Sequence, residues 1–298
     1  MPDPTQGPIG LVVVTYSPGD TLSTLLDSVP KATDRRVEIV LADNGSTDGS
    51  VEKAAQRAGV RLVRTGGNLG YGGAANLGAR ALGPSTYAIV VINPDVVLDP
   101  GSIDTLLDAL DRLPAAGSVG PLIVDEHGTV YPSARRLPTV GTGIGHAVFG
   151  WWWPSNPWTV AYRRDHAEPV ERRAGWLSGS CLVVRCEAWD QVGGFDPAYF
   201  MYFEDVDLGR RLQGAGWQNV YVPSARVMHL GGRATERAPA AMARAHHESA
   251  YRYLAGRYPR WWQAPLRLTL RSGLAARAFA ARRSAKVAGG AALPDRHA

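Results

Sequence analysis

Three acidic side chains crowd the segment 204–207, directly after an aromatic stretch at 200–203. Glu204, Asp205 and Asp207 fall in the first turn of a predicted helix, where the helix dipole alone would also favour carboxylates. Apolar surroundings can raise the pKa of a carboxylate toward that of a useful general base. Because consecutive helical residues point in different directions, we expect Glu204 and Asp205 to have different roles, one accepting a proton and the other orienting a group.

Polar loops follow four predicted strands at the point where each strand ends. They are Thr15 with Tyr16, Asp43–Ser46, Asn68–Tyr71 and Asn93–Asp95. Each loop alone is compatible with ordinary turn chemistry, since Asp43 can begin an Asx turn and Asp95 follows a proline. The carboxyl ends of parallel strands meet at one edge of a sheet, where such folds bind their ligands. Their convergence therefore predicts a ligand site at that edge.

The loop 66–73 is rich in glycine and contains Asn68 and Gly70. A dinucleotide fingerprint follows the first strand of its fold, whereas this loop follows the third and does not keep the G-x-G-x-x-G spacing. A dinucleotide-dependent dehydrogenase is therefore disfavoured. The glycines still allow a nucleotide to approach the backbone closely.

Asp95 is the natural metal ligand of the sheet edge. Mg²⁺ and Mn²⁺ prefer oxygen ligands and commonly share their shell with substrate phosphate. Such a cation would neutralise the charge that develops on a diphosphate leaving group. His229 is a plausible second ligand, although a single histidine after a strand is commonly structural.

The elements that must position these residues alternate between strand and helix. Strands are predicted at Ile9–Thr15, Val37–Ala42, Val60–Arg64 and Tyr87–Ile92, and helices at Asp20–Val29, from Ser46 or Asp48 to Ala58, at Gly73–Leu82 and at Asp99–Leu113. Farther along, strands are predicted at Trp176–Val184 and Gln218–Val222, with a helix at Glu204–Leu212 between them. Such an α/β series predicts a mostly parallel sheet flanked by helices.

The charge of the chain is divided unevenly. Its 298 residues carry a net charge of +5, but residues 239–298 hold 11 basic against 2 acidic residues and residues 1–238 hold 21 against 25. We therefore expect a catalytic domain at 1–238 and a basic, helical C-terminal extension at 239–298. Because the positive charge lies in the extension, a nucleic-acid partner is disfavoured. Cys181 and Cys186 are expected to be reduced thiols.

A family resemblance extends in order over about residues 9–235. The chain resembles the family-2 inverting glycosyltransferases of GT-A fold, and within them bacterial rhamnosyltransferases that act on N-acetylglucosaminyl-diphospho-polyprenol. The resemblance rests on VVVTY, ADNGSTDGS, GGNLGYGGAAN, VINPDV, GWLSGSCLVVR, GGFDPAYFMYFEDVDLGRRL and MHLGG. It implies a GT-A fold, a divalent cation (Mg²⁺ or Mn²⁺) and a nucleoside-diphosphate sugar as donor.

The resemblance also implies roles for individual residues. The residues expected at the donor nucleotide are Thr15, Tyr16, Asp43, Asn68, Gly70, Asn93 and Asp95. Asn93 and Asp95 stand where the family has its D-x-D motif, so Asp95 is the sole carboxylate there, with His229 as a second metal ligand. Asp205 matches the family's catalytic base, with Glu204 beside it. The residues expected under the acceptor sugar are Trp176, Ser178 and Gly179.

The function expected from these features is inverting glycosyl transfer, with dTDP-rhamnose as the expected donor, to a sugar hydroxyl of a lipid-linked cell-wall or polysaccharide precursor. Thymine and uracil present the same imide edge, so galactofuranosyl or other hexosyl transfer from a UDP-sugar stays open. A nucleotidyltransferase is disfavoured, because Thr15–Asp20 is not the basic, glycine-rich loop that such enzymes place after their first strand. A non-catalytic, membrane-peripheral binding module would have no need for Glu204 and Asp205.

The extension predicts an interfacial helix. Trp261 and Trp262 precede a segment in which Leu266, Leu270, Leu274 and Phe279 lie near one helical face with Arg267, Arg271 and Arg282 at its sides. Docking of this helix on the catalytic domain is the alternative. The N-terminus resembles no signal peptide and no apolar run reaches the length of a membrane span. We therefore expect a cytoplasmic protein, peripheral on the inner face of the plasma membrane, whose extension contacts anionic lipid.

Overall fold

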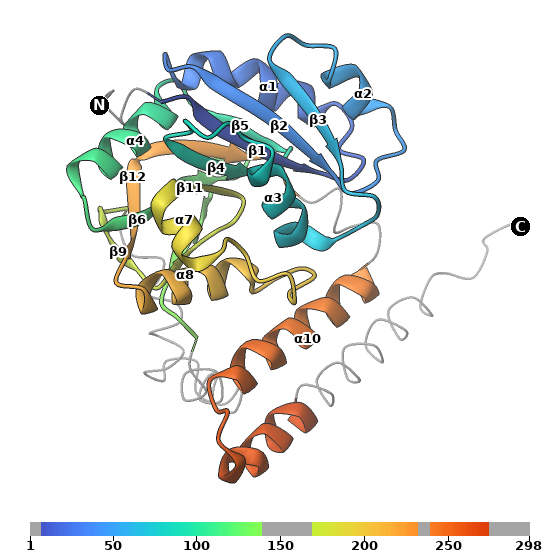
Figure 1. Ribbon diagram of the computed structural model, residues 1–298, viewed down its shortest axis with the longest axis vertical. Coiled ribbons are helices and arrows are strands. Elements are labelled where there is room, and N and C mark those ends of the chain that lie inside the picture. The colour runs from blue at the N-terminus through green and yellow to red at the C-terminus, as the bar shows by residue number, and fades with distance from the viewer. Residues whose placement is uncertain (1–6, 139–168, 232–238, 274–298) are drawn as a thin grey trace, which may run out of the picture.

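The computed structural model describes residues 7–138, 169–231 and 239–273 (Figure 1). Its strands are β1 Ile9–Thr15, β2 Val37–Asp43, β3 Val60–Arg64, β4 Ala88–Ile92, β5 Val96–Leu98, β6 Ala116–Val124, β7 Val130–Tyr131, β8 Ala134–Arg135, β9 Arg172–Ala174, β10 Trp176–Leu177, β11 Cys181–Arg185 and β12 Gln218–His229. The main sheet has the order β3-β2-β1-β4-β11-β6-β12-β5, with β7 paired to β6 and β9 to β12. β8 and β10 form a separate two-stranded sheet.

Helices cover both faces of the main sheet. They are α1 Thr21–Ala32, α2 Ser50–Ala54, α3 Gly70–Arg80, α4 Ser102–Arg112, α7 Cys186–Val192, α8 Glu204–Gly214 and α10 Pro239–Gly256, followed by the 3₁₀ turn η3 Trp261–Gln263 and helical residues 264–273. Leu11 and Val13 of β1 pack with α1, α2 and α4, whereas Val12 and Val14 pack with α3, α7 and α8. The alternation along one strand explains why β1 reads as a continuous apolar run.

The predicted mostly parallel α/β sheet is confirmed. β3, β2, β1 and β4 are parallel neighbours, and β11 is inserted antiparallel between β4 and β6. The short strand β5 and the buried strand β6 were not predicted. The sequence 116–124 contains Gly117, Gly120 and Pro121, which are uncommon inside strands and weaken the pattern.

Two local predictions were wrong. The helix expected up to Ala58 is the single turn α2, and its N-cap is Gly49 at φ +75°. The Ser46 hydroxyl donates to Asp43, and Asp48 Oδ1 accepts from the N–H and hydroxyl of Ser50, the first residue of α2. The continuous strand expected at Trp176–Val184 is broken into β10 and β11 by a turn at 178–180. In that turn the Ser178 hydroxyl bonds the hydroxyl and the backbone N–H of Ser180, which takes the backbone out of the ladder.

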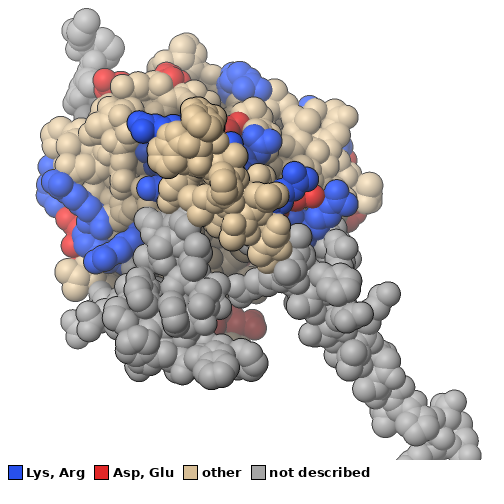
Figure 2. Space-filling model, turned by 90° about the horizontal axis from the view of Figure 1, so that it is seen from below, with Lys and Arg blue, Asp and Glu red and all other residues tan. Residues whose placement is uncertain are grey.

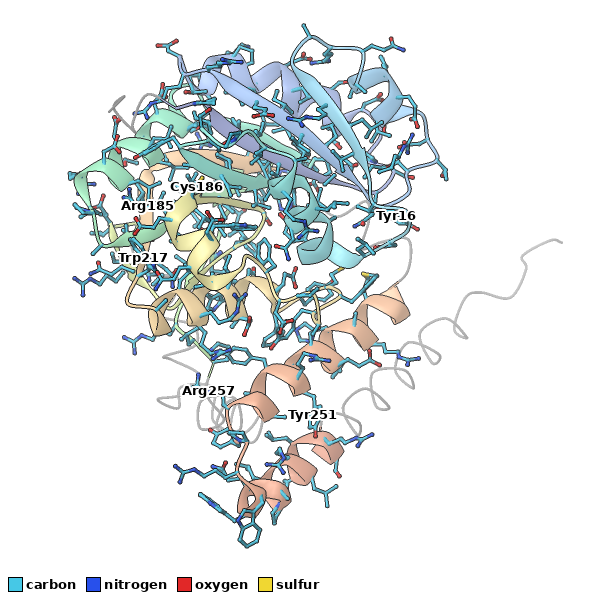
Figure 3. The ribbon with its side chains drawn as sticks, in the orientation of Figure 1. Tyr16, Arg185, Cys186, Trp217, Tyr251 and Arg257 are labelled. Carbon is cyan, nitrogen blue, oxygen red and sulfur yellow. The ribbon has the colours of Figure 1, made fainter. Side chains whose placement is uncertain are left out.

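The cysteines form no disulfide. Cys181 is buried in β11 and Cys186 is partly buried at the start of α7, beside Arg185 (Figure 3). Burial raises the pKa of both thiols, to about 12 for Cys181 and about 11 for Cys186. Two reduced thiols were predicted, and their raised pKa values make both of them weak nucleophiles.

Candidate active site

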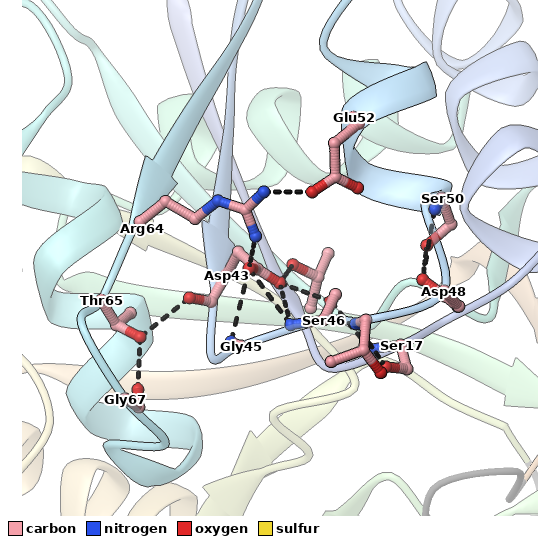
Figure 4. A network of polar contacts seen from close by, with 12 residues as sticks. Ser17, Asp43, Gly45, Ser46, Asp48, Ser50, Glu52, Arg64, Thr65 and Gly67 are labelled. Atoms are coloured by element: carbon pink, nitrogen blue, oxygen red, sulfur yellow. Dashed lines mark hydrogen bonds and ion pairs between the residues drawn. The ribbon is translucent and has the colours of Figure 1, made fainter.

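The first polar cluster lies where β1, β2 and β3 end side by side. The sheet register places Thr15 next to Asp43 and Asp43 next to Arg64. The Thr15 hydroxyl donates to Asp43 Oδ1 at 3.0 Å, and Arg64 Nη1 donates to Asp43 Oδ2 at 2.6 Å. The backbone N–H groups of Gly45 and Ser46 and the Ser46 hydroxyl complete the shell (Figure 4). We call these five residues the Asp43 cluster.

The Asp43 cluster keeps a buried negative charge in place. Asp43 is only 1% exposed, and this burial by itself would raise its pKa. Hydrogen bonds from Ser46, Thr15 and Arg64 outweigh burial and hold the pKa of Asp43 below its ordinary value. The carboxylate therefore orders the loops around it, with Thr15 buried beside it and Arg64 exposed at the rim of the cluster. Arg64, which sequence reasoning missed, could have been found from its place at the end of β3.

The glycine-rich loop closes onto the same edge. Asn44 Nδ2 donates to the Gly70 carbonyl at 3.0 Å, and Asn68 Oδ1 accepts from the Gly70 N–H at 3.0 Å. Gly70 has φ +75°, and a Cβ atom there would lie 1.9 Å from the Phe200 carbonyl oxygen. Only glycine fits both the conformation and the contact. Tyr16, with half of its surface exposed, lies at the rim of the same edge (Figure 3).

A second polar cluster contains the predicted metal ligands. Asp95 lies between β4 and β5, and His229 ends β12, which pairs with β5. His229 Nε2 lies 3.0 Å from Asp95 Oδ1 and 3.4 Å from Asn93 Nδ2. Both side chains keep a fifth to a quarter of their surface exposed. Among the described residues, no group of three or more Asp, Glu, His or Cys side chains converges in this way.

The spacing of this pair fits a small divalent cation. Ligand atoms about 2.1 Å from an octahedral ion occupy neighbouring corners about 3 Å apart, and Asp95 Oδ1 and His229 Nε2 are separated by that distance. Two protein ligands also leave corners for phosphate oxygens and water, as Mg²⁺ sites in phosphate-binding enzymes do. The residues present therefore fit a substrate-assisted cation site.

The third cluster is the acidic pair at the start of α8. The Gly179 N–H donates to Asp205 Oδ2 at 3.1 Å, and the Val206 N–H donates to Asp205 Oδ1 at 2.8 Å. Glu204 is 7% exposed, and its Oε2 has no hydrogen-bond partner among the described residues. Burial, reinforced by the neighbouring Asp205 charge, raises the pKa of Glu204 to about 8. Burial also raises the pKa of Asp205, to about 6, against the two amide hydrogen bonds and the Arg135 charge.

Asp207 has a separate, structural role. It forms ion pairs with Arg210 at 2.7 Å and Arg211 at 2.5 Å on the same helix. Of the three acids that the sequence groups together, only Glu204 and Asp205 thus lack a cationic ion-pair partner in the described part of the chain. Asp205 keeps part of its surface accessible, as a group that exchanges a proton with a substrate must.

The turn 178–180 joins the second and third clusters. The Asn93 N–H donates to the Ser180 carbonyl at 3.0 Å, while the next residue toward the N-terminus, Gly179, holds Asp205. Tyr71, which the sequence placed in a polar loop without a role of its own, donates its hydroxyl to the Gly179 carbonyl from α3. Ser178 is buried and bonds within the protein, so it supports this turn, whereas Trp176 is partly exposed.

The backbone before the acidic pair is strained and is packed against α10. Tyr202 and Phe203 both have φ +66°, a region that costs residues with a side chain about 1–3 kcal/mol. The Ser249 hydroxyl of α10 donates to the Met201 carbonyl at 2.9 Å, and the ring of Tyr253, 2% exposed, lies 5.6 Å from that of Phe203. α10, which lies in the predicted extension, therefore packs against the turn that precedes the acidic pair.

The end of the described chain exposes large apolar side chains. Trp261 is 85% exposed, Trp262 56% and Leu268 66%. Leu266 is partly buried and Leu270 is buried, so the helical face predicted from the leucines is not the exposed one; Leu274, Phe279 and Arg282 lie outside the described residues. In the part of the chain that the structure describes, no helix is long and apolar enough to cross a membrane.

Comparison with known proteins identifies close relatives. The Glycosyl transferase family 2 profile matches residues 11–170. The N-acetylglucosaminyl-diphospho-decaprenol L-rhamnosyltransferase of Mycobacterium tuberculosis is 55% identical over 277 residues, which span 90% of each chain. The rhamnosyltransferase WbbL of Escherichia coli K12 is 27% identical over 252 residues, covering 82% of this chain and 92% of that protein.

Solved structures share the fold. A mannosyltransferase from Pyrobaculum calidifontis, in complex with GDP-Man and Mn²⁺, superposes with a TM-score of 0.57 at 18% identity, covering 98% of this chain and 82% of that one. GalNAc-T7, solved with UDP, GalNAc and Mn²⁺, gives a TM-score of 0.55 at 19% identity over 77% of this chain and 45% of that one. The GT-A architecture implied by the sequence motifs is confirmed by these neighbours.

Proposed function

This chain belongs to glycosyl transferase family 2 and is a glycosyltransferase, and from that premise we propose that it transfers L-rhamnose from dTDP-rhamnose to N-acetylglucosamine carried on a polyprenyl diphosphate. The relative that is 55% identical over 90% of both chains supports this donor sugar and this lipid-linked acceptor. The observation that carries the chemistry is the position of Asp205. Its partly accessible carboxylate is oriented by the Gly179 amide, one residue from the Ser180 carbonyl that binds Asn93.

The proposed reaction is a direct displacement with inversion. An acceptor hydroxyl gives its proton to a carboxylate oxygen of Asp205 as its oxygen forms a bond to the anomeric carbon of the donor. The bond between that carbon and the donor diphosphate breaks, and its electron pair leaves with the diphosphate. The raised pKa of Asp205, to about 6, makes it a stronger base than an ordinary aspartate while leaving it largely ionised near neutral pH.

Glu204 is proposed to support Asp205 without exchanging the reaction's proton. Its pKa is raised to about 8 by burial and by Asp205, so it is protonated where Asp205 is ionised. A neutral Glu204 adds no second negative charge beside the base. In this proposal the two consecutive acids have different roles, Asp205 accepting a proton and Glu204 remaining neutral.

Asp95 and His229 are proposed to hold a divalent cation, Mg²⁺ or Mn²⁺, whose bound charge stabilises the departing diphosphate. Asn93 lies 3.4 Å from His229 Nε2 and orients that ring. We propose that Thr15, Tyr16 and the Asp43 cluster bind the nucleoside. Asn68 and Gly70 shape the wall beside it, and Trp176 and Gly179 face the acceptor sugar, with Ser178 beneath them.

We propose that residues 249–273 bind a membrane surface. Residues 249–273 contain five arginines and no acidic residue, and Arg260 lies over the ring of Trp262. Seen from below, the lowest part of the molecule presents uncharged surface between groups of Lys and Arg (Figure 2). Exposed tryptophans with arginines suit the interface of an anionic bilayer, where each basic residue contributes about 1 kcal/mol. A lipid-linked acceptor would be met at a membrane surface, and we propose that this surface is the inner face of the plasma membrane.

The function is tested with purified full-length protein, dTDP-rhamnose and a polyprenyl-diphosphate N-acetylglucosamine acceptor. We expect a rhamnosylated lipid by mass spectrometry, loss of product after chelation of divalent cations, and recovery with Mg²⁺ or Mn²⁺. UDP-galactofuranose and UDP-glucose serve as competing donors. Transfer of another sugar in preference to rhamnose would refute the proposed donor, and full turnover in excess EDTA would refute the metal.

The membrane contact is tested by sedimentation with vesicles of phosphatidylglycerol and phosphatidylcholine. We expect binding at low salt and release at high salt, because salt screens the arginine contribution. Replacing both Trp261 and Trp262 by Ala should weaken binding several-fold. Equal sedimentation of this variant and the wild type would show that the exposed tryptophans Trp261 and Trp262 do not bind lipid.

A further inference from the structure

Arg135 lies beside Trp176, one of the residues expected under the acceptor sugar, and its side chain contacts two aromatic rings. β8 pairs antiparallel with β10, and the register places Arg135 directly opposite Trp176. The Arg135 guanidinium carbon is 5.9 Å from the centre of the Trp176 ring and 5.9 Å from that of Tyr131. Its Nε donates to the Pro132 carbonyl at 3.0 Å, which fixes the orientation of the guanidinium plane.

The outer nitrogens of this guanidinium have no protein partner among the described residues. Other arginines of the domain pair with acids: Arg64 with Asp43, Arg112 with Glu171, and Arg210 with Asp207. In the same part of the chain, no carboxylate lies within 4.0 Å of Arg135. Aromatic rings and one carbonyl therefore hold the plane, while the two Nη groups retain the fork that binds phosphate in two parallel hydrogen bonds.

The guanidinium of Arg135 is close to Asp205, the proposed catalytic base. Trp176 packs against Gly209 of α8, where a Cβ atom would lie 2.8 Å from the Trp176 Cβ. Gly209 is one helical turn after Asp205, and the Arg135 charge is near enough to oppose the rise in the Asp205 pKa. The proposed metal ligands Asp95 and His229 lie instead on the other side of the turn 178–180, next to Asn93, whose N–H binds the Ser180 carbonyl. Arg135 is thus on the side of Asp205 from which an acceptor hydroxyl would arrive.

We propose that Arg135 binds the diphosphate of the lipid-linked acceptor. This inference rests on the proposed function, because that acceptor carries its diphosphate one sugar ring away from the hydroxyl that is attacked. Asp205 would bind the hydroxyl at one end of the sugar, Trp176 would contact the ring, and the Arg135 fork would hold the diphosphate at the other end. The site would then select N-acetylglucosamine linked to a diphosphate over the same sugar without one.

The test compares two acceptors in the full-length protein. One is an N-acetylglucosaminyl-diphospho-polyprenol, and the other is an alkyl glycoside of N-acetylglucosamine without phosphate. Arg135→Met keeps the stem that packs between the rings but removes the charge. Its exposed neighbour Arg136, which directly follows β8, provides the control Arg136→Met. Assays are run well above the rising limb of the pH profile, so that Asp205 is ionised in every variant.

We expect Arg135→Met to raise KM for the diphosphate acceptor about 10–100-fold, as loss of charge-assisted hydrogen bonds does. KM for the alkyl glycoside and KM for the donor should change less than about twofold, and Arg136→Met should resemble the wild type. Arg135→Lys, which keeps a point charge without the fork, should lie between.

Three outcomes would overturn the inference. An equal effect on both acceptors would make Arg135 a support of the loop, and a raised donor KM would assign it to the donor diphosphate instead. Near-wild-type KM values in Arg135→Met would remove it from the site. If the wild-type protein transfers to neither acceptor, the proposed function itself fails, which distinguishes that result from the other three.

Discussion

The Asp43 cluster and the acidic pair at Glu204 and Asp205 both bury carboxylates, with opposite electrostatic results. Asp43 is 1% exposed and its pKa is lowered. Glu204 is 7% exposed and its pKa is raised to about 8. Burial acts in the same direction at both places, so the hydrogen-bond donors decide the outcome. The Asp43 carboxylate accepts hydrogen bonds from two hydroxyl groups, two backbone N–H groups and a guanidinium, contributed by Thr15, Gly45, Ser46 and Arg64. In the acidic pair, Asp205 accepts hydrogen bonds from the backbone N–H groups of Gly179 and Val206.

The difference separates a binding group from a reacting group. A carboxylate that orders a binding site must stay charged and fixed, and the Asp43 cluster supplies protein donors in place of water. A general base must gain a proton during the reaction, so it benefits from being held with few donors. The strained turn at Tyr202 and Phe203 places the acidic pair in that poorly solvated position. Each prediction below alters one side of this contrast.

The largest expected effect follows removal of the base. Asp205→Asn keeps the size of the side chain and can still accept from Gly179, but it cannot take the acceptor's proton. We expect turnover to fall about 10²–10⁴-fold while donor affinity is retained. The exposed Asp190→Asn on α7 gives the same change in charge as a control. Turnover above about a third of the wild-type value would refute the assignment of Asp205.

The next largest effect is expected in the pH dependence: kcat, which depends on Asp205, should change with pH, whereas donor KM, which depends on Asp43, should not. Because the pKa of Asp205 is raised to about 6, the ionised base becomes scarcer below that pH, by about tenfold per unit. We expect kcat to rise between pH 5 and 7 and then level off. Donor KM should stay constant in that window, since the lowered pKa of Asp43 keeps it ionised. A rising limb centred at an ordinary aspartate pKa, about 4, would contradict the poorly solvated base.

A smaller effect is expected when the binding carboxylate is removed. Asp43→Ala deletes the acceptor of hydrogen bonds from Thr15, Ser46 and Arg64. We expect donor KM to rise about 10–100-fold, corresponding to about 1.5–3 kcal/mol, with kcat at saturating donor retained. Asp48→Ala in the exposed part of the same loop is the control. A fall in saturated kcat at unchanged donor KM would reverse the roles of the two sites.

The donor side of the molecule was more predictable from sequence than the acceptor side. Strand ends in a parallel sheet converge by geometry, so Thr15, Asp43, Asn68 and Asp95 could be grouped from the order of the strands alone. Asn93 and His229 meet because β12 pairs with β5, a strand that was not predicted. Their proximity was inferred from the family resemblance and now has a structural cause in that pairing.

The acceptor side depends on contacts between segments that no periodicity connects. Tyr71 reaches Gly179 across 108 residues, and the turn at Gly179 interrupts what reads as one strand. Two non-glycine residues with positive φ, at 202 and 203, have no sequence signature, because aromatic residues rarely adopt that conformation. The predicted boundary at residue 238 likewise separated α10 from the turn that it packs against.

The smallest expected effect tests that last contact. Ser249 is 6% exposed, and its hydroxyl donates to the carbonyl of Met201, immediately before the strained residues. Ser249→Ala removes one hydrogen bond worth about 0.5–1.5 kcal/mol, so relaxation of the turn should lower kcat about 2–10-fold. Donor KM should not change, because in the described part of the chain Asp43 is held by Thr15, Gly45, Ser46 and Arg64 and receives no hydrogen bond from α10. The neighbouring Glu248→Ala, which breaks only an exposed pair with Arg244, should leave kcat unchanged.

The readouts of this variant separate positioning from stability. If α10 positions the acidic pair, Ser249→Ala lowers kcat and shifts the rising limb of the pH profile, because the burial that raises the Asp205 pKa changes with the turn. If α10 only stabilises the fold, the melting temperature falls while kcat and the pH profile at a permissive temperature stay at wild-type values. The second result would mean that α8 and the turn 178–180 bury the acidic pair without help from α10. The contrast between the acidic pair and Asp43 would then depend on those two elements alone.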